Sequence, residues 1–425
     1  MEIHVPYGHT QLSAILPDNY VVESIEAVDT PALKNPELAV RKALDDLIGD
    51  VKWSDFIGAH SVAIAVNDKT RPVPHSHLLP PLLEQLNSLG IPDEAIRFFV
   101  AGGTHVPMEA EEFPLVLPGD LSKRYRVVVQ DAETYETMVN LGETSRGTPV
   151  WMNSDYVASD LKIVVGNIEP HQFAGFSGGV KSAAVGLAGL KTINFNHSLM
   201  SQPDAVLGEY EKNPVRQDIE EIGRKAGIQL ALDAVLNQER EIVHVLAGEP
   251  QAVMRAGVPV SRKVCQAIVH HRYDLIIASP GGYPKDINVY QAQKALAHAA
   301  LISREGSTII LAAACPEGAG SLHFEEWVHD KHSYEEVIKA FSDEGFRIGP
   351  HKAFLIARDA LKRKLLFCSG LSENQARSLL LTPVRDLQTA VDLAVKSLNP
   401  GDHIGVMPHA SSTIPFLEDD LDANR

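Results

Sequence analysis

Cysteine is scarce in this sequence: Cys265, Cys315 and Cys368 are its full complement in 425 residues. An odd number without a CxxC spacing argues against structural disulfides, zinc knuckles and iron–sulfur clusters. The last two lie in apolar runs, "LAAAC" and "LLFC". We therefore expect reduced, buried thiols.

Positive charge and long apolar runs are also in short supply. Lysine and arginine number 38 against 55 acidic residues, a formal net charge of −17. This balance disfavours a nucleic-acid partner, which requires a basic surface. The opening "MEIHVPYGHTQLSAILP" has no basic n-region and no long apolar h-region, and no stretch is apolar enough to cross a bilayer. We therefore expect a cytoplasmic protein with no membrane partner.

Two groups of motifs are missing as well. The sequence has no HExxH, EF-hand or cysteine cluster, so any metal must draw its ligands from distant loops. No G-x-G-x-x-G follows the first predicted strand with an acidic residue about 20 positions later, which disfavours an ordinary NAD-dependent dehydrogenase.

What the sequence does contain is an alternation of short apolar runs with amphipathic stretches, typical of strands joined by crossover helices. One helix is predicted to begin at Asn35, with Pro36 in its first turn, and to end at Gly49. Strands are predicted at 61–66, 96–102, 126–130, 161–166, 274–279, 307–314 and 402–407. The pattern predicts an α/β fold with mostly parallel sheets flanked by helices.

The length predicts two domains, because 425 residues exceed the usual size of one hydrophobic core. The best boundary lies near 265–272, where the helix-like "VSRKVCQAIVHH" is followed by a new strand. We therefore expect an N-terminal domain of residues 1–268 and a C-terminal domain of residues 269–400. Residues 401–425 either complete the second sheet or rejoin the first domain.

Polar, glycine-containing loops follow four of the predicted strands, and ligands of open α/β sheets bind outside the carboxyl ends of strands. The loops read "NDKTRPVPHSH", "GTHVP", "NIEPHQFAGFSGGVKS" and "PGGYPKDINVYQAQK". His105 and His171 lie in these loops, and His197 follows in "NFNH". Imidazole suits general acid–base chemistry at neutral pH, so we predict functional roles for these three histidines.

Other side chains of these loops suit an anionic ligand. Arg71 can bind a carboxylate through two parallel hydrogen bonds, and Asp68, three residues earlier, can hold the guanidinium in place. Gln291 and Lys294 are also three residues apart, which places them on one face of a helix. A surface ion pair is the alternative for Arg71, and the spacing of Gln291 and Lys294 alone does not assign them a role.

The stretch "GFSGGVKS" imitates a phosphate-binding P-loop, but Val180 stands where that motif has a glycine directly before its lysine. Lys181 has three possible roles: a point charge on a phosphate, a nucleophile that forms a covalent adduct, or a surface charge. Spacing does not rank them. A nucleotide-binding, kinase-like protein therefore stays open as an alternative.

Five runs together resemble the nickel-dependent lactate racemase family, in the order of that family and over essentially the whole chain. They are "NDKTRP", "GGTH", "NIEPHQFAGFSGGVKS", "NFNH" and "GGYPKDINVYQAQK". The resemblance implies two α/β domains with the active site in the cleft between them. It also implies a covalently attached nickel-pincer nucleotide, derived from a nicotinate dinucleotide and supplied by cofactor-assembly enzymes.

The resemblance assigns roles to individual residues. It implies that Lys181 is the covalent tether, that His197 is the nickel ligand, and that His105 and His171 are the acid/base pair. Asp68 is implied to orient Arg71 or the cofactor. The implied substrate contacts are Arg71, Tyr290, Gln291 and Lys294, and the implied cradle of the cofactor phosphate is Ser177, Gly178 and Gly179.

The implied activity is a racemase or epimerase that inverts C2 of a 2-hydroxy acid by transient hydride transfer, because the C2 hydrogen is too weakly acidic to leave easily as a proton. In lactate racemases an aromatic residue of the second domain packs against the substrate. Here "FRIGPHKAFLIA" offers His351 or Phe354. A wall without a large aromatic side chain predicts a 2-hydroxy acid longer or more polar than lactate. The expected partners are this small molecule, the assembly enzymes and, as one possibility, further copies of the chain.

Overall fold

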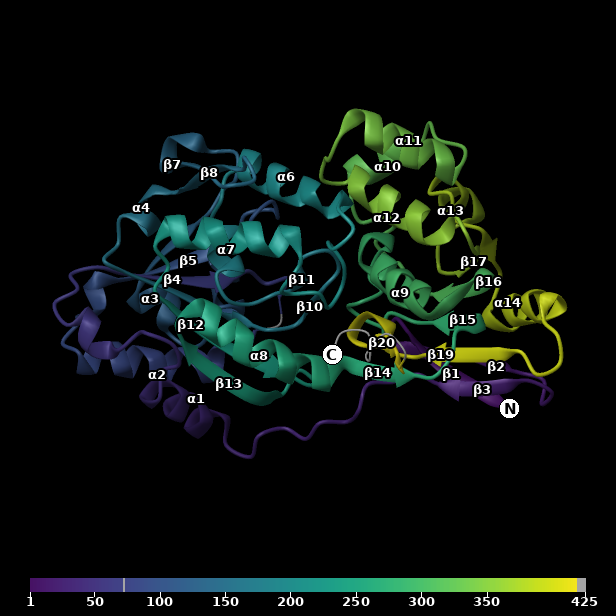
Figure 1. Ribbon diagram of the computed structural model, residues 1–425, viewed down its shortest axis with the longest axis horizontal. Coiled ribbons are helices and arrows are strands. Elements are labelled where there is room, and N and C mark those ends of the chain that lie inside the picture. Colours follow the sequence, from purple (N-terminus) through teal and green to yellow (C-terminus); the bar gives the residue numbers. More distant parts are fainter. Residues whose placement is uncertain (72, 419–425) are drawn as a thin grey trace. The chain divides into compact units, whose positions relative to one another are not determined.

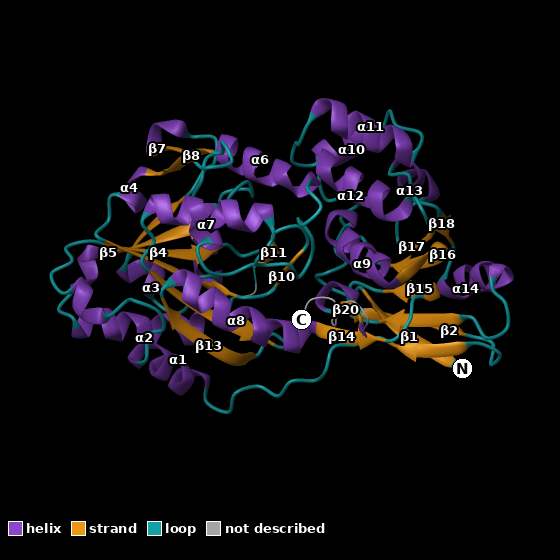
Figure 2. Cartoon of the chain, in the orientation of Figure 1, coloured by secondary structure: helices purple, strands orange, loops and turns teal. Residues whose placement is uncertain are grey.

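The computed structural model describes residues 1–71 and 73–418, and its chain divides into two compact units (Figure 1). Unit 1 comprises residues 1–28 and the chain from residue 265 onward, and unit 2 comprises residues 29–264. Each unit contains a six-stranded sheet with helices on it (Figure 2). The predicted α/β fold with mostly parallel sheets is thereby confirmed.

The sheet of unit 2 has the strand order β13-β12-β9-β4-β5-β6. All neighbouring strands are parallel except β12 and β13, which are antiparallel. The bounds are β4 Val62–Asn67, β5 Ile96–Ala101, β6 Arg126–Val129, β9 Leu161–Asn167, β12 Leu230–Leu236 and β13 Ile242–Gly248. Four of these strands were predicted, and the sequence analysis missed β12 and β13.

One face of this sheet is covered by α1 (Pro36–Asp45) and α2 (His75–Ser88), whose apolar side chains join those of the strands in one core. The predicted start of α1 is confirmed: Asn35 Oδ1 accepts the amide of Leu38 at 3.0 Å. The remaining helices of unit 2 are α3 Leu121–Arg124, α4 Ser154–Val157, α5 Lys181–Ala184, α6 Leu190–Ser198, α7 Pro214–Ala226 and α8 Pro250–Cys265. Its two-stranded pairs are β7–β8 (Met138–Glu143, Pro149–Asn153) and β10–β11 (Pro170–His171, Gly175–Phe176).

The sheet of unit 1 is parallel throughout, with the order β18-β17-β16-β15-β19-β3. The bounds are β3 Val21–Ser24, β15 Tyr273–Ala278, β16 Ser303–Ala312, β17 Lys364–Cys368, β18 Pro383–Val384 and β19 His403–Met407. Its helices are α9 Val289–Ile302, α10 Leu322–Val328, α11 Tyr334–Glu344, α12 Pro350–Ala360, α13 Glu373–Ser378 and α14 Leu387–Ala394. A short parallel pair, β14 (Gln266–Val269) with β20 (Ile414–Leu417), completes the unit.

The predicted division near residue 268 lies close to the observed one at residue 265, but residues 1–28 belong to unit 1 and not to the predicted N-terminal domain of residues 1–268. The hairpin β1–β2 (Glu2–Tyr7, Thr10–Ile15) places Ile3 and Val5 in one core with the sheet and α14, and β3 is the edge strand beside β19. Strand β19 completes this sheet between β15 and β3, and β20 pairs with β14 in the same unit, so the C-terminal segment does not rejoin unit 2. The division follows from these long-range apolar contacts, which leave no local signal in the sequence.

Two further expectations concern cysteine and membranes. All three cysteines, which lie in the described part of the chain, are buried and form no disulfide, as predicted. Within residues 1–71 and 73–418, no helix is long and apolar enough to cross a membrane.

Candidate active site

A polar pocket of about 100 Å³ lies at the carboxyl ends of β4, β5 and β9 in unit 2. Most of the site residues predicted in this part of the sequence line it: Asp68, Arg71, His105, His171, Ser177, Gly178, Lys181 and His197. Asn67, Glu169 and Ser182 line it as well, and the sequence analysis missed them. The loops that follow three adjacent strands thus converge, as the strand-end argument predicts.

Asp68 and His105 form a hydrogen-bonded pair in this pocket. The distance between Asp68 Oδ2 and His105 Nδ1 is 2.6 Å, and Asp68 Oδ1 accepts from Thr70 Oγ1 at 2.7 Å. Burial favours a raised pKa for Asp68, but the hydrogen bonds from His105 and Thr70 outweigh it and lower the pKa. The ionised carboxylate accepts only, so Nδ1 of His105 donates and Nε2 of the neutral ring keeps its lone pair. Asp68 therefore orients His105, a contact that the sequence analysis missed.

Replacing Asp68 with asparagine should lower turnover by roughly a hundredfold, because the amide can present a donor to Nδ1 and favour the wrong tautomer of His105. The measurement is kcat of the variant and of the unaltered protein under the same conditions. Asp155→Asn is the control, since that exposed carboxylate pairs with Arg97 at 3.1 Å outside the pocket. Equal turnover of the Asp68 variant and the unaltered protein would contradict this role.

His171 has the opposite tautomer. The backbone amide of Ala174 donates to Nδ1 of His171 at 3.3 Å, which places the proton of the neutral ring on Nε2. Its ring lies edge-on to Phe173 at 4.8 Å between centroids, and Phe173 in turn lies 5.0 Å from the ring of His197. The ring of Phe173 therefore contacts the rings of both His171 and His197.

His197, on α6, is held as a neutral imidazole. Burial, together with the nearby charge of Lys181, lowers the pKa of His197 to about 3. Its Nδ1 lies 3.1 Å from Oδ1 of Asn196, and buried Asn196 donates to Asp218 Oδ2 at 2.8 Å. A neutral imidazole whose Nδ1 is hydrogen-bonded presents Nε2 as a ligand. No motif in the sequence pointed to Asn196 or Asp218.

The glycine-rich loop that precedes Lys181 requires two of its glycines. Gly178 has φ +90° and Gly179 has φ +55°, and a Cβ on Gly178 would lie 2.8 Å from Ile168. Val180 is buried against α7, where a Cβ on Gly223 would lie 2.5 Å from the Cβ of Val180. This packing explains the residue that breaks the P-loop pattern, and it does not favour the kinase-like alternative.

Asp233, on β12, lies beneath this loop and is 1% exposed. Its Oδ2 accepts the amide of Gly179 at 2.8 Å, while Oδ1 has no hydrogen-bond partner among the described residues. Burial raises the pKa of Asp233 to about 6. The folded state therefore binds this proton more tightly than the unfolded chain, so the contribution of Asp233 to stability is greatest below pH 4 and is lost as the pH rises through 6.

Asp233→Asn should remove this loss of stability at higher pH, because the amide oxygen can still accept from Gly179 and no charge is buried. At pH 8 the free energy of unfolding should increase by roughly 1 to 3 kcal/mol, with little change at pH 4. Denaturant unfolding at both pH values measures the effect. Asp160→Asn should instead decrease the free energy of unfolding at pH 8, because hydrogen bonds from His60 and Ser61 stabilise the ionised carboxylate and lower the pKa of Asp160. A stability that falls equally with pH in protein and variant would contradict the assignment.

The remaining predicted residues lie on α9 of unit 1. Lys294 Nζ donates to Gln291 Oε1 at 2.9 Å, so the two side chains share one face of the helix. The ring of Tyr290 lies edge-on to His351 at 5.7 Å between centroids. Phe354 stacks on Phe341 at 4.6 Å instead. Of the two aromatic candidates in "FRIGPHKAFLIA", His351 is therefore the one beside Tyr290.

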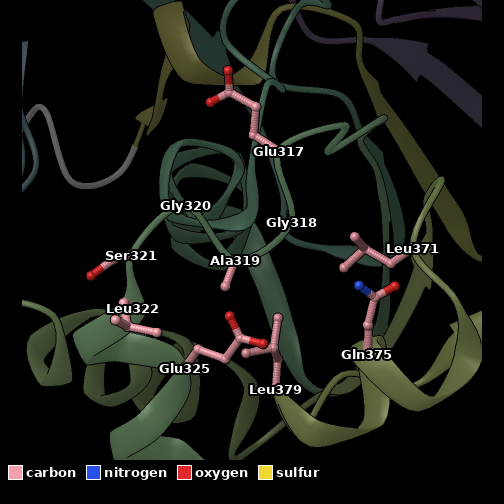
Figure 3. Close-up of a pocket in the computed structure, with 10 residues that line it drawn as sticks. All are labelled: Glu317, Gly318, Ala319, Gly320, Ser321, Leu322, Glu325, Leu371, Gln375 and Leu379. Atoms are coloured by element: carbon pink, nitrogen blue, oxygen red, sulfur yellow. The ribbon is translucent and has the colours of Figure 1, made fainter.

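Unit 1 also holds a larger cavity of about 330 Å³, which contains none of the predicted site residues (Figure 3). It lies between the 317–321 loop, α10 and α13. The side chains that line it are two carboxylates, an amide, a hydroxyl and aliphatic groups: Glu317, Glu325, Gln375, Ser321, Ala319, Leu322, Leu371 and Leu379. Unlike the first pocket, its lining includes no histidine, lysine or arginine among the residues that the structure describes.

Comparison with known proteins identifies the family. Residues 7–208 match the lactate racemase N-terminal domain, and residues 268–414 match the lactate racemase C-terminal domain. The chain is 29% identical over 422 residues to lactate racemase of Thermoanaerobacterium thermosaccharolyticum, covering 97% of this chain and 98% of the relative. It is 32% identical over 377 residues to lactate racemase of Lactiplantibacillus plantarum, covering 87% and 88%.

Solved structures agree with this result. The lactate racemase apoprotein of Thermoanaerobacterium thermosaccharolyticum superposes with a TM-score of 0.91 at 28% identity, covering 98% of this chain and all of that chain. A protein of Thermotoga maritima, with a TM-score of 0.65 and 18% identity, shares the fold. The relatives identify the protein as an isomerase of the racemase type. The chain belongs to the lactate racemase family.

Proposed function

We propose that this protein inverts the C2 stereocentre of a 2-hydroxy acid, using a nickel-pincer nucleotide attached to Lys181. One observation carries the proposal: two histidines with complementary tautomers, a lysine and a neutral imidazole ligand line the same pocket of a racemase-family chain.

The residues of the pocket fit such a cofactor. Within the part of the chain that the structure describes, no group of three or more His, Cys, Asp or Glu side chains could hold a metal ion. One neutral imidazole, His197, suits a metal whose other donors come with an organic ligand, and nitrogen ligands suit Ni(II). Lys181 provides the amine for attachment. Of the residues predicted to cradle the phosphate, Ser177 and Gly178 line the pocket, whereas the amide of Gly179 is bound by Asp233. When bound, the nickel-pincer nucleotide supplies reversible hydride acceptance from C2.

The two histidines handle the hydroxyl proton. His105, oriented by Asp68, presents the Nε2 lone pair and accepts the hydroxyl proton of one enantiomer of the substrate. His171, in its protonated imidazolium form, would give a proton from Nε2 to the oxygen of the planar 2-oxo acid from its own side and become neutral. In the reverse direction the roles exchange. Each histidine is therefore needed in both directions, once as base and once as acid.

Arg71 is the proposed carboxylate ligand, because its planar guanidinium can form two parallel hydrogen bonds with the substrate. Gln291 and Lys294 are the further substrate-binding residues that we propose from the family resemblance, with Tyr290 on the same helix. His351, beside Tyr290, is smaller and more polar than a large aromatic side chain. We therefore propose a substrate longer or more polar than lactate.

The decisive experiment compares protein made with and without the cofactor-assembly enzymes. Intact mass, nickel content and chiral product analysis should show an added mass on Lys181, one nickel site and racemisation only in the first sample. His197→Ala should lose nickel, whereas His244→Ala, at an exposed position of β13, should keep it. Turnover should be compared for lactate, malate, 2-hydroxyglutarate and aromatic 2-hydroxy acids. Loaded protein that racemises none of them contradicts the function, and a clear preference for lactate contradicts the proposed substrate class.

A further inference from the structure

A buried ion pair lies behind the glycine-rich loop, on α7. Arg216 is 1% exposed and Glu220 is 7% exposed. Glu220 Oε1 accepts from Nε of Arg216 at 2.9 Å and from Nη2 at 2.7 Å, and the hydroxyl of Tyr210 lies 3.2 Å from the same oxygen. None of these three side chains lines the pocket.

The guanidinium of Arg216 also binds the loop backbone. Nη1 donates to the carbonyl of Phe176 at 3.2 Å and to the carbonyl of Gly178 at 3.1 Å. The next amide along, that of Gly179, donates to Asp233 Oδ2 at 2.8 Å. Backbone groups of three residues within a four-residue stretch are therefore held by buried charged or acidic side chains.

Stability alone is a weak reason for this arrangement. Buried ion pairs often contribute little net stability, because desolvation offsets the attraction, and apolar replacements of both partners are often tolerated. Geometry is a stronger reason. A loop with Gly178 and Gly179 in succession has many accessible backbone conformations, and the side chain of Lys181 starts two residues later. Directional bonds to fixed carbonyls select one of these conformations.

We propose that Arg216 and Asp233 are positioning residues, which fix the backbone of the loop from the protein interior so that Lys181 is presented to the pocket in one orientation. The role of this orientation in cofactor attachment rests on the proposed function. The ordering of the loop does not, and the two can be tested separately.

Arg216→Met combined with Glu220→Gln removes the charge pair without leaving an unpaired buried charge and keeps an acceptor for Tyr210. Arg216→Lys keeps the charge but not the planar fork that reaches both carbonyls. The control is Arg363→Met in unit 1, where a half-buried arginine also donates to two carbonyls, those of Asp359 at 3.0 Å and Ala300 at 2.9 Å.

Hydrogen exchange of the loop peptide, measured on protein without cofactor, tests the ordering. In both Arg216 variants the amides of residues 175–182 should exchange about tenfold faster. Losing the hydrogen bonds from the guanidinium makes local opening of the loop more favourable by roughly that factor. The rest of unit 2 and the control should exchange as before. Unchanged loop exchange in a folded variant overturns the proposal.

Mass spectrometry of protein co-produced with the assembly enzymes tests the consequence. The fraction of chains modified at Lys181 should fall several-fold in both Arg216 variants and stay unchanged in Arg363→Met. Full modification despite faster loop exchange also overturns the positioning role. Absence of any modification in the unaltered protein would refute the proposed function instead, and would leave the exchange result standing.

Discussion

Lys181→Arg should abolish racemisation. Arginine keeps the positive charge of the side chain, but its guanidinium stays protonated and does not act as a nucleophile. A lysine that only neutralised a phosphate would tolerate this change with a modest loss of binding. A covalent tether does not tolerate it. Intact mass should therefore show no added group, and chiral analysis should show no turnover above background.

Lys191→Arg is the matched control for this experiment. Lys191 lies on α6, exposed to solvent, with Nζ 5.1 Å from the ring centroid of Tyr135, and arginine can make the same cation–π contact. Its variant should be modified at Lys181 and should be fully active. An active Lys181→Arg enzyme would show that the lysine acts as a charge and not as a tether.

His105→Gln and His171→Gln should each lower kcat by about a hundredfold to ten-thousandfold, because each removes one acid–base group from a proton transfer. The two variants should differ in which enantiomer they still oxidise. Each retains the base for one enantiomer only, so rapid quenching with single enantiomers should yield 2-oxo acid from opposite substrates in the two variants.

An exposed histidine of the same unit serves as control here. His60→Gln leaves the pocket unchanged and should retain full activity with both enantiomers. If both site variants lost the same enantiomer, His105 and His171 would not act from different sides of the substrate.

Much of the pocket could be predicted from strand ends alone. Asn67, Ala101 and Asn167 end three neighbouring parallel strands, and the reactive loops follow directly. Parallel pairing carries these loops to one edge whatever their separation in sequence, so local apolar runs were sufficient to place them. His105, His171 and Lys181 were therefore accessible to sequence reasoning.

The residues that contact and position these side chains could not be predicted in the same way. In the sequence Val180 only breaks a P-loop pattern, whereas in the structure Gly223 of α7 leaves space for its side chain. The spacing of Asp68 and Arg71 suggests that they are partners, whereas the structure shows a 2.6 Å contact of Asp68 with His105. Asn196 and Asp218 form no motif. Each of these contacts joins segments through the tertiary fold, and no short-range pattern encodes the choice of partner.

The position of the first residues in unit 1 has a consequence for folding. The hairpin β1–β2 and strand β3 are synthesised first, yet the amide of Ile15 bonds to Gln388, 373 positions later, and β3 pairs with β19 near the other end of the chain. Unit 2 is one continuous segment, residues 29–264. During synthesis, unit 2 can complete its core and form the pocket at its strand ends before unit 1 has the strands to complete its own sheet.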